Sequence, residues 1–145
     1  MKPVVTWIVL ANARTTKVLE HRGTGNGLTA LDNYIWHAPV ARVPSDNAGV
    51  GHSIAGPAIS AVEDTDAKAV NDAQFAKDVI GHLAKAQSAK AFDRLVLVSG
   101  PHMLGLLRAQ INPALQAVLL GELDKDLSME SIKDVAAHLG ELIAV

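Results

Sequence analysis

The stretch RLVLVSGPHMLGLLRAQ, residues 94–110, carries the clearest structural signal in the sequence. Residues 95–98 form a short, entirely apolar run, which is typical of a strand buried on both faces. Gly100 and Pro101 then end the strand and open a helix, because proline is favoured at the first helical position. We therefore predict a strand, a tight turn and a helix that reaches about Gln110.

The first third of the chain predicts three more strands. VVTWIVLA, residues 4–11, is rich in β-branched residues and nearly all apolar, so it is typical of a buried strand. Residues 15–21 alternate in polarity, and the glycines of RGTGNG, residues 22–27, favour a tight reversal. Residues 28–36 resume as a strand, which completes an antiparallel meander of three strands.

Between the meander and residue 94, residues 66–90 predict a long helix. Polar residues, Asp72 among them, lie off the apolar stripe of this helix. The stripe consists of Val70, Ala73, Ala76, Val79, Ile80 and Leu83. A strand, helix, strand, helix order implies a parallel pair of strands with a right-handed crossover.

The end of the chain completes an α/β fold. NPALQ, residues 112–116, predicts one helical turn, residues 117–123 a further strand, and Ser128 the cap of a last helix. We expect one domain, residues 1–145, with a mixed sheet made of the antiparallel meander plus parallel strands and covered by helices. This arrangement resembles the ribonuclease-H-like fold.

Composition excludes several classes of function. Thirteen basic and fifteen acidic residues give a formal charge of −2, so the chain lacks the basic excess of proteins that bind nucleic acid mainly through phosphates. The absence of cysteine excludes disulfides, thiolate metal sites and thiol nucleophiles. We expect no metal or cofactor. The apolar run at residues 4–11 is too short to span a membrane, so we expect a cytoplasmic protein with no membrane partner.

The apolar period disappears between residues 37 and 64, where NAGVGHSIAGPA, residues 47–58, stands. Prolines and glycines break regular elements here, and irregular connections beyond about 12–15 residues are uncommon unless they are functional or disordered. We predict a working loop at residues 44–58, and an idle surface loop is the alternative. Its candidate binding residues are Asp46, Gly49, Gly51, His52 and Ser53.

A second candidate site is the turn that follows the strand at residues 95–98. Ser99, Gly100 and His102 lie at the start of a helix, where free amide groups and the helix dipole favour an anion. The carboxyl ends of parallel strands are also where ligands usually bind. Arg14, just after the first strand, is a further candidate for binding an anion. A plain turn and a surface ion pair are the alternatives.

The chain resembles the bacterial host-attachment family, described as proteins required for attachment to host cells. The resemblance rests on FDRLVLVSGPHMLGLLRAQINPALQAVLLGELDKDLS, residues 92–128, and on WIVLANARTTKVLE, residues 7–20. Ser45, Asp46 and Gly49 fit an Asp-Arg-Pro-Gly-Arg-like stretch of the family, but its arginines are missing here.

That family is similar to the middle domain of eukaryotic peptide-chain release factors and of the ribosome-rescue protein Pelota. Release factors carry a Gly-Gly-Gln loop where this chain has residues 49–53, and His52 stands in place of the glutamine. The resemblance therefore implies a binding protein rather than an enzyme, with the ribosome, tRNA or another protein as partner of loop 44–58. Alternatives are a hydrolase that combines His52 with the turn at residues 99–102, and a self-associating homodimer.

Overall fold

The computed structural model describes residues 3–39, 48–140 and 142–143, and within residues 48–66 it describes the backbone alone. The elements of this described part follow one another as β1 (Thr6–Ala11), β2 (Thr15–His21), β3 (Thr29–Ala30), β4 (Trp36–His37), α1 (Ala48–Ser88), β5 (Arg94–Ser99), α2 (Pro101–Gln110), α3 (Pro113–Val118), β6 (Leu119–Asp124) and α4 (Ile132–Leu139).

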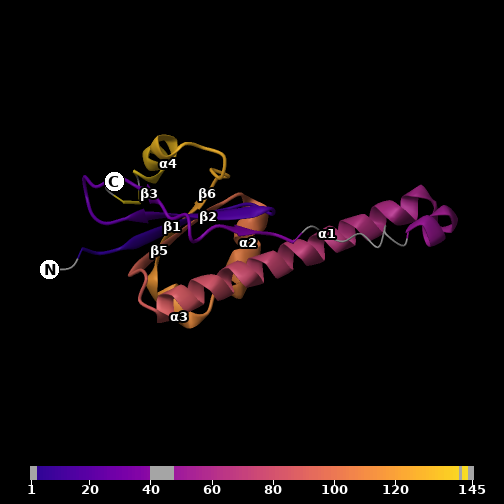
Figure 1. Cartoon of the computed structure of the whole chain (residues 1–145), viewed down its shortest axis with the longest axis horizontal. Helices are drawn as coiled ribbons and strands as arrows, with labels where there is room; N and C mark the ends of the chain where they lie inside the picture. Colours follow the sequence, from indigo (N-terminus) through magenta and orange to yellow (C-terminus); the bar gives the residue numbers. More distant parts are fainter. Residues whose placement is uncertain (1–2, 40–47, 141, 144–145) are drawn as a thin grey trace.

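The strands of the described residues form one mixed sheet, in the order β3, β2, β1, β5, β6, with β4 also pairing with β2. β1 is antiparallel to β2 and parallel to β5, and β5 is parallel to β6. β1 lies in the middle of the sheet, and all of its residues are buried. This burial is expected for a nearly continuous apolar run. The predicted α/β class and mixed sheet are confirmed, and the order is compatible with a ribonuclease-H-like arrangement (Figure 1).

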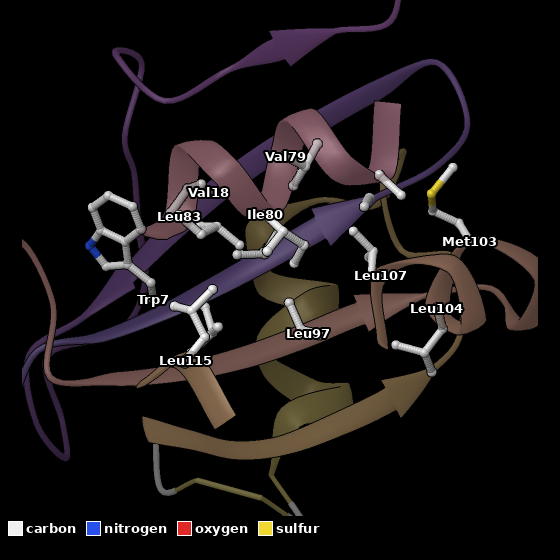
Figure 2. Packing of buried hydrophobic residues seen from close by; sticks show 14 of the residues in the cluster. Trp7, Val18, Val79, Ile80, Leu83, Leu97, Met103, Leu104, Leu107 and Leu115 are labelled. Atoms are coloured by element: carbon white, nitrogen blue, oxygen red, sulfur yellow. The ribbon is translucent and has the colours of Figure 1, made fainter. Parts of the chain in front are cut away.

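Helices cover both faces of the sheet. α1, α2 and α3 lie on one face, and α4 lies on the other (Figure 1). Figure 2 shows Val79, Ile80 and Leu83 of α1 between the helix and the sheet, close to Leu97 and to Leu107 of α2. The smaller core on the opposite face joins α4 to β1 and β5. The two apolar layers therefore hold the central strands β1 and β5 between helices on both faces.

The buried stripe of α1 differs from the predicted one at its amino end. Val70, predicted to be buried, is 70% exposed, whereas Asp72, predicted to lie on the polar face, is 3% exposed. The reason is the helical period: counting back from Phe75 and Ala76, which are both buried, places residue 72 on the core side and residue 70 away from it.

The predicted third strand, residues 28–36, is wrong as a continuous element. It consists of two short strands, β3 and β4, which both pair with β2. Between them Asp32 and Asn33 form a turn, and the Tyr34 N–H donates to the Leu31 carbonyl at 3.0 Å. Asp and Asn stabilise turns through their short polar side chains, so they interrupt the strand here.

The long helix begins at Ala48 rather than at residue 66, so most of the predicted loop 44–58 is helical. Glycine and proline lower helix propensity, but helix growth from an already packed segment is cooperative, and Ala55, Ala58 and Ala61 are good helix formers. The amino-terminal part of α1 extends away from the sheet (Figure 1). None of the helices in the described residues is both long and apolar enough to cross a membrane.

Two predicted helix starts meet different outcomes. Asn112 caps α3 as expected, because its side chain accepts a hydrogen bond from the Leu115 N–H at 2.8 Å. The predicted cap Ser128 is wrong, since α4 is capped by Ser131, whose Oγ accepts from the Asp134 N–H at 3.2 Å. Ser128 is instead fully buried and bonded elsewhere, as described below.

Candidate functional site

The carboxyl ends of the three parallel strands meet at one edge of the sheet. Ala11 of β1 pairs with Ser99 of β5, and Ser99 pairs in turn with Asp124 of β6. The loops that follow these strands therefore lie next to one another. Open sheets of this kind usually bind their ligands at such an edge, which makes it the candidate site.

A partly buried polar network, with Ser128 at its buried centre, occupies this edge on the side of α4. The Asn12 side-chain carbonyl accepts hydrogen bonds from the N–H groups of Arg14 and Thr15 at 2.7 and 2.8 Å, which shapes the β1–β2 turn. The Asn12 amide nitrogen donates to Ser128 Oγ at 2.8 Å, and Ser128 Oγ donates to the Asp126 carboxylate at 2.5 Å. This network ties the first turn of the chain to the segment before α4.

On the side of α1, the edge holds a histidine–carboxylate pair. His102 Nε2 lies 3.1 Å from a carboxylate oxygen of Asp72. The Asp72 side chain is 5% exposed and the His102 side chain is 68% exposed. The Asp72 carboxylate thus orients the imidazole ring of His102, while most of the His102 side chain stays exposed to solvent. Such a pair can position a proton donor or acceptor.

Two carboxylates lie near the turn at residues 99–102, where the sequence predicts a bound anion. Gly100 is the N-cap of α2 without a side-chain cap, and Pro101 takes the first helical position, as predicted. A Cβ placed on Gly100 would lie 3.9 Å from the Cβ of Asp126, and Asp72 lies on the other side beside His102. Both acids oppose a phosphate or sulfate at this turn. Anion binding by Ser99, Gly100 and His102 stays a prediction.

The structure brings some of the predicted residues together and separates others. Ser99 is buried and donates its Oγ hydrogen to the Ala11 carbonyl at 2.9 Å, so its hydroxyl joins two strands. Arg14 is exposed at the β1–β2 turn on the same edge. Asp46 lies outside the described residues, and four further candidates lie in the first turns of α1, where the backbone alone is described: Gly49, Gly51, His52 and Ser53.

The hydrolase alternative requires His52 to approach the turn at residues 99–102. Asp72, which touches His102, lies twenty residues after His52 in the same helix. At 1.5 Å per residue this separation corresponds to about 30 Å along a straight helix. The two halves of the predicted hydrolytic site therefore do not meet. In the described residues no three histidine or acidic side chains are grouped so as to hold a metal ion.

Sequence reasoning missed Asp72, Asn12, Asp126 and Ser128 as members of this edge. For Asp72 a signal exists, because a carboxylate in phase with Phe75 and Ala76 on a buried stripe must find a partner. Asn12 and Asp126 are typical of ordinary turns, and Ser128 is typical of a helix cap, so none of the three indicated a shared network.

The fold and the edge define a class: an α/β protein with an open mixed sheet and a polar carboxyl edge. The family described as "Protein required for attachment to host cells" matches residues 7–139, which is most of the chain. The chain belongs to this host-attachment family. No curated protein is similar enough to match it.

We expect the Asp72–His102 pair to behave as a coupled unit. His102→Ala leaves a buried carboxylate without its partner and should lower the free energy of unfolding by about 1–3 kcal/mol. In an Asp72→Leu background the same change should cost close to nothing, because no buried charge is stranded. Urea unfolding of the two single variants and the double variant measures the coupling. Equal costs of His102→Ala in both backgrounds would show that the pair is not coupled.

Proposed function

We propose that this host-attachment-family protein acts by binding, and that its binding element is the α1 arm, defined here as residues 48–66. The observation behind the proposal is the length of α1. The helix has 41 residues, about 60 Å, but its described buried residues begin at Asp72 and residues 67–70 are all exposed. The arm continues from there away from the sheet (Figure 1).

The sequence of the arm supports an apolar partner. Residues 47–62 contain no Asp, Glu, Lys or Arg, and they include Val50, Ile54, Ile59 and Val62. Glycine and proline in a helix cost about 1 and 3 kcal/mol relative to alanine, so this sequence needs packing to stay helical. Because the sheet does not extend along the arm, a groove on another protein is the packing surface that we propose.

The ribosome is the first partner to test, on the proposal that the host-attachment family resembles the middle domain of release factors and of Pelota. The arm has no Lys or Arg, and its charged residues are the acids Glu63, Asp64 and Asp66, so it should make few contacts with RNA phosphates, whose affinity falls steeply with salt. We therefore propose a contact with an apolar protein surface of the ribosome. Its affinity should change little with ionic strength.

The test replaces two apolar residues of the arm by acids. We expect the wild-type chain to sediment with ribosomes at about 50 mM and about 500 mM salt alike, and Ile54→Glu with Ile59→Glu to reduce the bound fraction about tenfold. Met129→Glu is the matched control, because Met129 is 86% exposed and follows the sheet on the side of α4. This control should bind like the wild type.

Three results would contradict the proposal. Absence of the wild-type chain from ribosome pellets at low salt removes the ribosome as partner. Equal binding of the Ile54, Ile59 double variant removes the arm as the contact. Sedimentation velocity supplies the third: a wild-type dimer that the double variant converts to monomer would identify a second copy of the chain as the partner of the arm.

A further inference from the structure

A cavity of about 280 Å³ lies at the opposite edge of the sheet, where the parallel strands begin. Three of its lining residues stand in a row across β2, β1 and β5: Thr6 pairs with His21 on one side and with Arg94 on the other. Strand alternation places all three on the face covered by α4, in phase with Ile8, Leu19 and Val96 of the smaller core.

One ring nitrogen of the histidine in this row has no hydrogen-bond partner among the described residues. His21 is 6% exposed, and its Nε2 atom is buried without a hydrogen bond to any described residue. A buried polar atom left unpaired destabilises the folded protein, and a ligand that pairs with it removes that penalty. Nε2 donates a hydrogen bond in one neutral tautomer and in the protonated ring, and it accepts one in the other neutral tautomer. The positive charge of Arg94, at the other end of the row, therefore decides in favour of a ligand that accepts hydrogen bonds.

Arg94 supplies positive charge to the same cavity. Its side chain is exposed and, among the described residues, forms no ion pair. A guanidinium group binds carboxylates through two parallel hydrogen bonds. The larger cavity nearby, about 330 Å³, differs in this respect, because its Arg22 is already paired with Glu20 at 2.6 Å.

Three large aliphatic side chains form much of the remaining wall of the cavity. Leu120 of β6 is 39% exposed, and Leu142 and Ile143 follow α4 across the end of the sheet. Leu142 fits against Gly121, where a Cβ would lie 3.0 Å from one of its methyl groups. The absence of a side chain at Gly121 thus lets the segment after α4 close over the cavity.

We propose that this cavity binds a small organic acid. Its carboxylate accepts hydrogen bonds from Arg94 and, once the ring turns to expose this atom, from Nε2 of His21, which is buried in the free protein. Its apolar body lies against Leu120 and Leu142. The volume suits a molecule of a few carbon atoms. This proposal is independent of the α1 arm, because the cavity and the arm lie at opposite ends of β1. The cavity lies at the amino end of β1, and the arm leaves the sheet on the side of the carboxyl end of β1 (Figure 1).

The test is a titration of the ¹⁵N-labelled chain with hexanoate, followed by NMR, with hexanamide as an uncharged probe of the same shape. We expect saturable shifts at Gly23, Thr24 and Gly121 and at the His21 ring nitrogen, with a dissociation constant of about 1 mM for a ligand of this size. Hexanamide should bind at least about tenfold more weakly, because it lacks the charge-assisted hydrogen bonds.

Variants separate the proposed site from general binding of acids. Arg94→Gln should weaken hexanoate binding about tenfold, since it removes the guanidinium from an exposed position without opening the core. Lys77→Gln is the matched control: Lys77 is an exposed cation on α1, away from the cavity, and its loss should leave the affinity unchanged. Absence of saturation by hexanoate, equal binding of hexanamide, or an equal effect of the Arg94 and Lys77 variants would overturn the proposal.

Discussion

Trp7→Ala is expected to lower the free energy of unfolding by about 3–5 kcal/mol. Trp7 is 1% exposed at the beginning of the central strand β1. Its ring lies 4.5 Å from the Tyr34 ring and 4.7 Å from the Phe92 ring, measured between centroids. The substitution removes the largest side chain of the main core and leaves a cavity next to Tyr34 and Phe92.

The measurement is urea unfolding followed by circular dichroism, because the substitution also removes a fluorophore. Trp36→Ala is the matched control: Trp36 is half-buried and stacks on His82 at 4.7 Å, so its loss should cost about 1 kcal/mol. Domains of this size are stable by about 5–15 kcal/mol, and Trp7→Phe gives a milder variant if the alanine variant does not fold. Equal losses for Trp7→Ala and Trp36→Ala would refute the assignment of Trp7 as the principal core anchor.

Asn12→Ala is expected to cost about 2–3 kcal/mol, because three hydrogen bonds of about 1 kcal/mol each are lost together. Two of them shape the β1–β2 turn, and the third reaches Ser128, 116 residues further along the chain. Asn33→Ala is the control, because Asn33 is an exposed turn residue for which a change within about 0.5 kcal/mol is expected.

A double-mutant cycle with Ser128→Ala identifies the long-range part of the effect. The combined loss should be smaller than the sum of the two single losses, because the hydrogen bond between Asn12 and Ser128 is counted in each of them. Strict additivity would contradict the network, and a cost of Asn12→Ala no larger than that of Asn33→Ala would contradict the role of the turn.

Local patterns predicted the parts of the fold whose signal is local. Residues 4–11 and 94–110 gave the central strands and α2 because continuous apolar runs and a Gly-Pro boundary act within a few residues. The prediction of a continuous third strand was wrong at Asp32 and Asn33, where the preference of these residues for a turn outweighed β-propensity. The predicted start of α1 was wrong because it relied on the low helix propensity of single glycines and prolines, whereas helix growth is cooperative along the chain.

The candidate site was predictable only in part, for a related reason. The Gly-Pro boundary located Ser99, Gly100 and His102, but the partner of His102 is thirty residues earlier in the chain. Ser128 read as a cap because serine often is one, while its actual partners, Asn12 and Asp126, depend on how β1 and α4 are brought together. Side-chain partners across the sheet follow from the tertiary fold, which no local pattern contains.

The outer position of β6 in the sheet has a consequence for how the chain behaves when concentrated. A terminal strand offers its free backbone groups to any other extended chain, which is a route to uncontrolled association. Glu122, paired with Arg108, and Asp124 place acidic groups along this strand. If two copies paired through this strand, these charged side chains would lose contact with water, which disfavours association through the free backbone groups.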